Sequence, residues 1–233
     1  MIDLAIPAEP FIQLLVKNSL IHSGKPLVKV VTIPAVVGGD LSPQVADITT
    51  GTNCVVSGLG EANWQALLPA LKQANPKGIL FMGAQGNLDN KVIKSFGSFT
   101  DGWIACGIYP DESLPQWATY RAALKKYKAD PSQDYNSLGG LGTWAGYVGF
   151  TNIVKTIKGP VTNLTFLAAV KKTSRLTTGK LTPAINFTQE WTGLQGFNRL
   201  FNRYVTFDVA KNGKFAPYNN GAFYDLTGAL QGK

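Results

Sequence analysis

Short apolar segments alternate along this chain with longer segments in which apolar residues recur at the helical period. The clearest helical pattern covers residues 61–75, where Trp64, Leu67, Leu68 and Leu71 recur at that spacing. Buried strands are predicted where short apolar or β-branched segments are bounded by Gly, Pro or other turn residues, at 27–33, 53–56, 79–82 and 103–108. Strands that alternate with helices in this way predict an α/β fold with parallel strands.

The remaining segments continue this alternation less regularly. Further helices are predicted in a short segment after Pro43 and at 7–21, 88–96, 117–127, 139–158 and 161–171. Further strands are predicted at 2–6, in a short segment ending at Phe187, and at 204–209, with a hairpin turn at 211–214. We expect an irregular tail from Pro217 to Lys233. The extended, proline-containing segment 109–115 predicts a domain boundary.

One loop stands out as a candidate binding site. The apolar strand 79–82 ends in Gly83, and the loop that follows contains Gln85, Gly86 and Asn87. In open α/β sheets, ligands bind outside the carboxyl ends of the strands. Gln85, a hydrogen-bonding amide in the middle of this flexible loop, is therefore the predicted centre of a site. The alternative is an ordinary turn between a strand and a helix, rich in Gly and Asn.

The charge pattern limits the classes of partner. Charged residues make up only 15% of the chain, yet its net charge is +8. The densest basic groups, 125–128 and 171–172, are typical of solvated helix ends. We expect no nucleic-acid partner, because no basic stripe with interleaved aromatic residues is present. No membrane insertion is expected either, because no apolar segment approaches the ~18 residues that a spanning helix needs. Asp3 stands where a signal peptide would have a basic region.

The sequence is unpromising for catalysis. Cys54 and Cys106 lie in or beside apolar segments, where a free Cys is usually a small buried hydrophobe. His22 is the single histidine, so neither a Cys/His pair nor a metal cluster is expected, and no Gly-x-Ser-x-Gly motif is present. The glycine-rich segment 139–150 lacks the features of a phosphate loop and is expected to be part of a closely packed helix. We therefore expect no catalytic residue, metal or cofactor.

An ordered set of short motifs resembles one known family. The set includes Gly24-Lys-Pro, Asp40-Leu-Ser-Pro, Cys54-Val-Val-Ser-Gly-Leu, Phe81-Met-Gly-Ala-Gln-Gly, Asp101-Gly-Trp, Leu181-Thr-Pro and Gly196-Phe-Asn-Arg. In this order they resemble the periplasmic-binding-protein type I family, specifically the leucine/isoleucine/valine-binding-like solute receptors of ABC transporters. The resemblance covers almost the whole chain.

The resemblance implies a protein of two three-layer lobes with parallel sheets, which closes on a small ligand. By this comparison, residues 1–108 are nearly all of the second lobe. Residues 109–200 are the returning part of the first lobe, and 201–233 are the final hinge-side strand and the tail. The beginning of the first lobe is then absent, so the first lobe is incomplete and the chain is truncated at its N-terminus. Ligand binding by such a chain is expected to be weak or absent, and its first-lobe part is expected to expose an apolar sheet surface prone to association.

The resemblance also assigns ligand-binding roles. The position of Gln85 is often an acid in amino-acid-binding members, where it pairs with the ammonium group of the ligand. The neutral Gln85 favours an amide, an alcohol or another uncharged group instead. The Ser57-Gly58-Leu59 loop matches a ligand-contacting loop of the family, although it lacks the aromatic residue of that loop. Asn87 is a further polar candidate. Tyr109, at the crossover, either lines the cleft or packs at the hinge.

The function implied is that of a non-catalytic, extracytoplasmic component of an ABC importer. Its partners are a small amino acid or amide-like ligand and the permease subunits. Its location is periplasmic or extracellular, with a lipoprotein anchor as one form of the full-length protein. Two alternatives stay open: a ligand-sensing module of the same fold, and a flavodoxin-like enzyme with a small cofactor.

Overall fold

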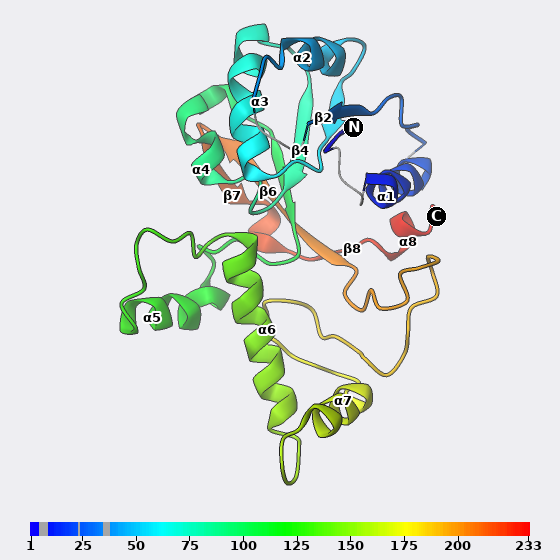
Figure 1. Cartoon of the computed structure of the whole chain (residues 1–233), viewed down its shortest axis with the longest axis vertical. Coiled ribbons are helices and arrows are strands. Elements are labelled where there is room, and N and C mark those ends of the chain that lie inside the picture. The colour runs from blue at the N-terminus through cyan, green and yellow to red at the C-terminus, as the bar shows by residue number, and fades with distance from the viewer. Residues whose placement is uncertain (5–8, 23, 35–37) are drawn as a thin grey trace. The chain divides into compact units, whose positions relative to one another are not determined.

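The computed structural model describes residues 1–4, 9–22, 24–34 and 38–233 (Figure 1). The chain forms two compact units. Unit 1 consists of residues 1–107, 207–219 and 228–233, and unit 2 consists of residues 108–206 and 220–227. The chain therefore passes from one unit to the other after residues 107, 206, 219 and 227. The end of the strand predicted at 2–6 and the first two residues of the helix predicted at 7–21 lie outside the described residues.

The strands of unit 1 form two sheets. β1 (Ile2–Leu4) and β2 (Val31–Ile33) pair in parallel. The larger sheet has the order β3 (Cys54–Val56), β4 (Leu80–Ala84), β5 (Ile104–Gly107), β6 (Tyr204–Lys211) and β7 (Lys214–Pro217). Its first three strands are parallel, which confirms the parallel arrangement predicted from the sequence. β6 and β7 form an antiparallel hairpin whose turn residues, Asn212 and Gly213, both have positive φ.

Helices pack against the larger sheet through a single apolar core. α1 (Glu9–His22), α2 (Ser42–Thr49), α3 (Glu61–Ala74), α4 (Asn90–Ile93) and the 3-10 segment η1 (Lys94–Thr100) alternate with strands β1 to β5. The predicted periodicity of α3 is confirmed, because Trp64, Leu67, Leu68 and Leu71 are all fully buried. They pack with Phe81 of β4 and with other sheet residues in one cluster.

The regular elements of unit 2 are mostly helices, joined by long loops. Its helices are η2 (Pro115–Trp117), α5 (Ala118–Lys126), α6 (Leu138–Val154) and α7 (Asn163–Lys172). Its core contains Trp117, Tyr120 and Leu141. The segment 127–203, which is described throughout, contains no strand. The strand predicted to end at Phe187 was wrong, since only a single bridge joins Leu176 to Ile185.

The tail is more regular than its sequence indicates. It begins with the 3-10 segment η3 (Tyr218–Gly221) and continues with β8 (Tyr224–Asp225) and α8 (Thr227–Leu230). β8 pairs with the first residues of β6, a contact between distant segments that local patterns do not reveal. Among the described residues, no helix combines the length and apolar content needed to cross a bilayer.

Candidate functional site

The carboxyl ends of β3 and β4 bring the predicted site residues of unit 1 together. Val56 at the end of β3 is in register with Met82 of β4. Ser57 continues the pairing, because its backbone N–H donates to the carbonyl oxygen of Met82 over 2.8 Å. The loops that start at Ser57 and Gln85 therefore leave the same edge of the sheet, where ligands of α/β proteins bind.

The Ser57–Leu59 loop is tightly packed. The Ser57 hydroxyl is buried and accepts a 3.0 Å hydrogen bond from the Leu59 backbone N–H. The Leu59 side chain is 0% exposed and belongs to the apolar core of the unit. Gly58, between them, is half-buried. Backbone groups at Gly58 are accordingly the part of this loop best placed to contact a ligand.

Gln85 follows β4 directly, and its side chain turns toward the sheet. Its backbone N–H donates to the Cys106 carbonyl oxygen over 2.8 Å, which continues the β4–β5 ladder by one residue. The side chain is 9% exposed, and its Nε2 donates to a carboxylate oxygen of Asp208 over 3.0 Å. Because the carboxylate is an acceptor, this bond fixes which end of the amide faces it. Gln85 Oε1 is buried and has no hydrogen-bond partner among the described residues. It is therefore an unsatisfied buried acceptor close to the carboxyl edge of the sheet.

Asp208 is the residue of this cluster that the sequence did not reveal. It lies on β6, is 4% exposed, and shares the buried face of that strand with Thr206 and Ala210. A buried carboxylate is uncommon, and it orients the amide that faces it. The available signal was the alternation of β6, in which two polar residues, Thr206 and Asp208, fall on the same side as Ala210.

Gly107 provides the space that the Gln85 side chain occupies. A Cβ atom built on Gly107 would lie 1.8 Å from Gln85 Oε1 and 2.5 Å from its Cδ. No larger residue fits this position unless Gln85 moves. The orientation of Gln85 thus depends on the lack of a side chain at the end of the neighbouring strand.

The electrostatics of the cluster disfavour nucleophilic chemistry. Burial, together with the negative charge of Asp208, raises the pKa of the Cys106 thiol to about 11. At neutral pH the thiol is therefore protonated, and the thiolate is the reactive form. Cys54 is exposed, and both cysteines are free. The cluster can form hydrogen bonds to a ligand, and its one thiol is poorly suited to attack one.

Asn87 and Tyr109 have different surroundings. Asn87 is half-buried, and its backbone N–H donates to the Ala84 carbonyl oxygen over 3.1 Å in the turn that contains Gln85. Tyr109 belongs to unit 2. Its ring contacts Trp117 edge to face at 6.1 Å, and burial raises the pKa of its hydroxyl.

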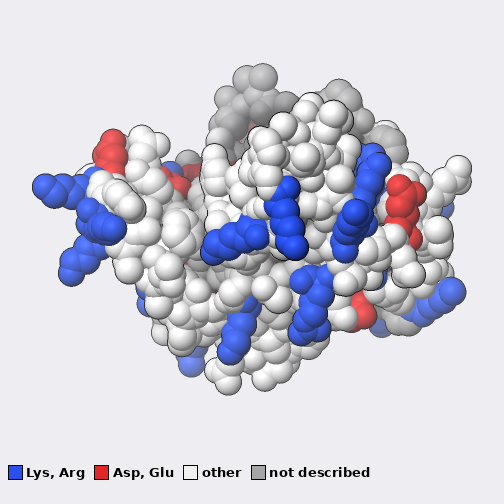
Figure 2. Space-filling view, turned by 90° about the horizontal axis from the view of Figure 1, so that it is seen from below, with Lys and Arg blue, Asp and Glu red and all other residues white. Residues whose placement is uncertain are grey.

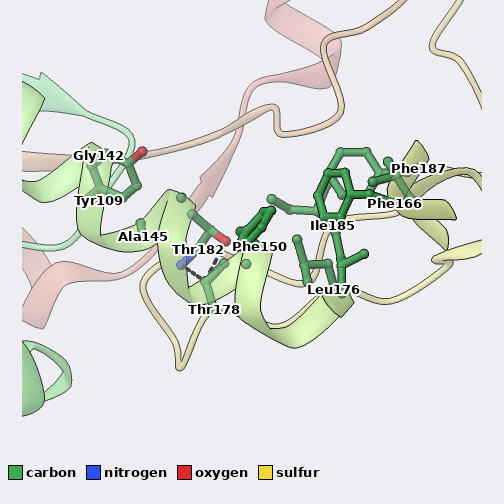
Figure 3. A pocket seen from close by; sticks show the side chains of 14 residues that line it. Tyr109, Gly142, Ala145, Phe150, Phe166, Leu176, Thr178, Thr182, Ile185 and Phe187 are labelled. Atoms are coloured by element: carbon green, nitrogen blue, oxygen red, sulfur yellow. Dashed lines mark hydrogen bonds between the residues drawn. The ribbon is translucent and has the colours of Figure 1, made fainter. Parts of the chain in front are cut away.

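Unit 2 contains a separate apolar hollow (Figure 3). Its volume is about 360 Å³, and its lining includes Tyr109, Phe150, Phe166, Leu176, Ile185 and Phe187. One polar pair lies in it, because the Thr178 and Thr182 hydroxyls are 2.8 Å apart. The apolar surface expected from the resemblance was a sheet. The segment 127–203 contains no strand and so exposes no sheet surface, and the hollow is lined mainly by α6, α7 and the loops after α7.

Neither a family model nor a curated protein sequence matches the chain. Solved structures do match. One is a solute-binding protein of an ABC transporter from Rhodopseudomonas palustris HaA2 in complex with p-hydroxybenzoic acid. Its TM-score is 0.73 at 15% identity, over 96% of this chain and 59% of that chain. The chain has the type I periplasmic-binding-protein fold.

Two further structures with this fold also match the chain. One is a leucine-, isoleucine-, valine-, threonine- and alanine-binding protein from Brucella ovis in a closed conformation, with a TM-score of 0.68 at 14% identity, over 96% of this chain and 56% of that chain. The other is an extracellular ligand-binding receptor from Verminephrobacter eiseniae, with a TM-score of 0.70 at 17% identity, over 92% of this chain and 60% of that chain. The names of the Brucella and Rhodopseudomonas neighbours give amino acids and an aromatic acid as their ligands.

The chain spans less than two thirds of the length of these neighbours, from 56 to 60% in the three comparisons. The part of the fold present here is consistent with the incomplete first lobe that the resemblance implied.

Proposed function

We propose that this chain is part of the extracytoplasmic solute-binding component of an ABC importer. The likeness of its fold to solute-binding proteins supports the class of function. One observation supports the location of the proposed site. The buried Gln85 carbonyl oxygen has no hydrogen-bond partner among the described residues and lies at the carboxyl edge of the sheet. Ser57, Gly58, Leu59 and Asn87 belong to the two loops that leave the same sheet edge, and Gly58 contributes backbone groups.

The lobe assignment is part of this proposal. Residues 1–108 form most of the second lobe, 109–200 the returning part of the first lobe, and 201–233 the final hinge-side strand and tail. The ligand is held between the two lobes, and its contacts with both favour the closed state. Tyr109 lines the cleft from the crossover. A chain with one incomplete lobe retains only part of these contacts, and its affinity is correspondingly low.

The chemistry of Gln85 supports a ligand that carries a hydrogen-bond donor. Its Oε1 accepts one hydrogen bond, and Asp208 behind it holds the amide in that orientation. A small amino acid or an amide-like molecule provides such a donor. The protein functions outside the cytoplasm, periplasmic or extracellular, and delivers its ligand to the permease subunits of the importer.

Amide-resolved NMR of the purified chain tests this proposal, because it detects weak binding. L-Leucine, L-glutamine and p-hydroxybenzoate are titrated separately to millimolar concentration. One of the first two ligands is expected to shift the signals of Gly58, Gln85, Gly86 and Asn87 together. The variant Gln85→Met keeps the length of the side chain, removes the acceptor and is expected to abolish these shifts.

The matched control is Gln65→Met, because Gln65 lies exposed on α3 and bonds to Glu61 of the same helix. This variant is expected to bind as the parent protein does. Shifts caused only by p-hydroxybenzoate would contradict the ligand class. If no ligand shifts the Gln85 loop, or if Gln85→Met binds normally, the proposed site is wrong.

A further inference from the structure

The segment from Tyr135 to Gln189 contains no Asp or Glu. Its six basic residues are Lys155, Lys158, Lys171, Lys172, Arg175 and Lys180. All six are exposed, and none forms an ion pair within the described part of the chain. This segment therefore carries most of the net charge of the protein without any acid to offset it. Figure 2 shows Lys and Arg side chains spread widely over the face that it views.

Aliphatic side chains project to solvent beside these cations. Leu164 is 74% exposed, Val161 52% and Leu167 50%, and α7 has no buried residue. Leu164 and Leu167 are three residues apart, and Lys171 follows Leu167 by four. Residues at this spacing lie on the same side of a helix. One surface of α7 thus combines exposed leucines with lysines at its carboxyl end.

A hollow of about 610 Å³ adjoins this surface. It is lined by residues from the end of α6, from α7 and from the following loop, among them Lys158, Lys172, Arg175, Thr165, Thr173 and Ser174. Three cations around one concavity are suited to phosphate oxygens, which accept charge-assisted hydrogen bonds from them. The Thr165 and Thr173 hydroxyls donate to backbone carbonyl oxygens, so the cations are the main donors that the hollow offers. We use the name α7 surface for Val161, Leu164 and Leu167 together with Lys158, Lys171, Lys172 and Arg175.

We propose that the α7 surface binds peripherally to an anionic lipid bilayer. Headgroup phosphates occupy the hollow and pair with Lys158, Lys172 and Arg175, while Val161, Leu164 and Leu167 enter the boundary between headgroups and acyl chains. An interfacial helix is recognised by such a combination of basic residues and exposed aliphatic residues. A nucleic acid would satisfy the cations and leave the aliphatic side chains in water. The inference concerns unit 2 alone and does not depend on the Gln85 site.

Vesicle co-sedimentation of the purified chain tests the proposal. Vesicles of phosphatidylcholine alone are compared with vesicles that contain equal parts of phosphatidylcholine and phosphatidylglycerol. We expect binding only to the second kind, with a loss at high salt. Because each basic residue near an anionic surface strengthens binding by about five-fold, the double variant Lys171→Glu/Lys172→Glu is expected to bind at least about 25-fold more weakly. Leu164→Ser/Leu167→Ser is also expected to weaken binding.

The control Lys125→Glu/Lys126→Glu makes the same change in net charge on α5, where Asp130 and Asp134 follow in the sequence. We expect this control variant to lose much less affinity for the anionic vesicles than the Lys171→Glu/Lys172→Glu variant does. All of the replaced leucines and lysines are exposed or half-exposed, and circular dichroism checks that each variant is folded. Equal losses in the α5 and α7 charge variants would indicate attraction by net charge alone and would overturn the proposal. So would unchanged binding of the leucine variant, which indicates a purely ionic partner such as an acidic protein, or a lack of binding to the anionic vesicles.

Discussion

Gln85 and Asp208, 123 residues apart in the sequence, are joined by a 3.0 Å hydrogen bond between two buried side chains. The bond links the end of β4 to β6, across the position of β5 in the sheet. It explains why the Gln85 amide has one orientation. The carboxylate of Asp208 holds the nitrogen, and the carbonyl oxygen has no hydrogen-bond partner among the described residues.

Removal of this carboxylate is expected to destabilise the protein. In Asp208→Ala, the buried Nε2 of Gln85 loses its acceptor, which costs about 1–3 kcal/mol of unfolding free energy. Urea unfolding measures the change. The control is Asp47→Ala, because Asp47 is exposed and forms a surface ion pair with Lys29 at 2.9 Å, worth about 1 kcal/mol or less. Equal effects of the two replacements would show that the Gln85–Asp208 bond contributes no more to stability than the surface ion pair does.

The glycine at the end of β5 gives a second test. In Gly107→Ala, the new methyl group overlaps the Gln85 side chain, so Gln85 must leave its position. Overpacking of this kind costs about 1–3 kcal/mol, and ligand-induced shifts at Gln85 are expected to disappear. Thermal and urea unfolding measure the stability of the variant.

Gly146→Ala is the matched control for this replacement. Gly146 lies inside α6, and a Cβ atom there meets nothing within 4 Å. Because Ala favours a helix over Gly by up to about 1 kcal/mol, this variant is expected to be slightly more stable than the parent. A stable Gly107→Ala variant with an unchanged Gln85 signal would contradict the packing described above.

The two cysteines are expected to react at very different rates. Cys54 is exposed, whereas the pKa of the partly buried Cys106 is raised to about 11 by burial and by the charge of Asp208. With a chromogenic disulfide reagent at pH 8, one thiol per chain is expected to react rapidly and the second only after unfolding. Cys54→Ser should remove the fast phase. A fast phase that persists in this variant would mean that Cys106 is accessible and ionised.

The same pKa shift predicts a loss of stability at alkaline pH. Below pH 9 the Cys106 thiol is protonated in both the folded and the unfolded protein. Between pH 9 and 11 the thiol loses its proton in the unfolded protein but keeps it in the folded protein. Deprotonation therefore lowers the free energy of the unfolded state relative to the folded state, and the protein becomes less stable. The shift of about two pKa units corresponds to about 2–3 kcal/mol of unfolding free energy across this range.

Other groups titrate in the same pH range, so the comparison with Cys106→Ala isolates the contribution of the thiol. The difference in unfolding free energy between the parent and this variant is expected to shrink as the pH rises from 9 to 11. A difference independent of pH would mean that the thiol has an ordinary pKa in the folded protein.

The sequence predicts those parts of the fold that depend on neighbouring residues. The period of Trp64, Leu67 and Leu71 defines α3 directly, and the apolar segment before Gly83 defines β4. The location of Gln85 at the carboxyl edge of a sheet follows from that strand alone. The Ser57 loop joins it because β3 and β4 are adjacent parallel strands.

The sequence does not predict the contacts that depend on distant pairings. Asp208 reaches Gln85 only because β6 is placed beside β5, and no local pattern specifies that neighbour. The pairing of β8 with β6 is equally remote from local signals. The inward orientation of the Gln85 side chain depends on Gly107. The role of Gly107 becomes clear only when the ends of β4 and β5 are known to lie side by side.

The division of the chain into alternating segments has a consequence for synthesis. Unit 1 needs residues 207–219 to complete its sheet, and these leave the ribosome only after nearly all of unit 2 has been made. Until then, one edge of β5 lacks part of its partner strand β6. Gln85 also lacks Asp208, the carboxylate that orients its amide. An exposed strand edge invites pairing with other chains. The nascent protein is therefore most vulnerable to misassembly during translation of the segment 108–206, and the arrival of the β6–β7 hairpin ends that interval.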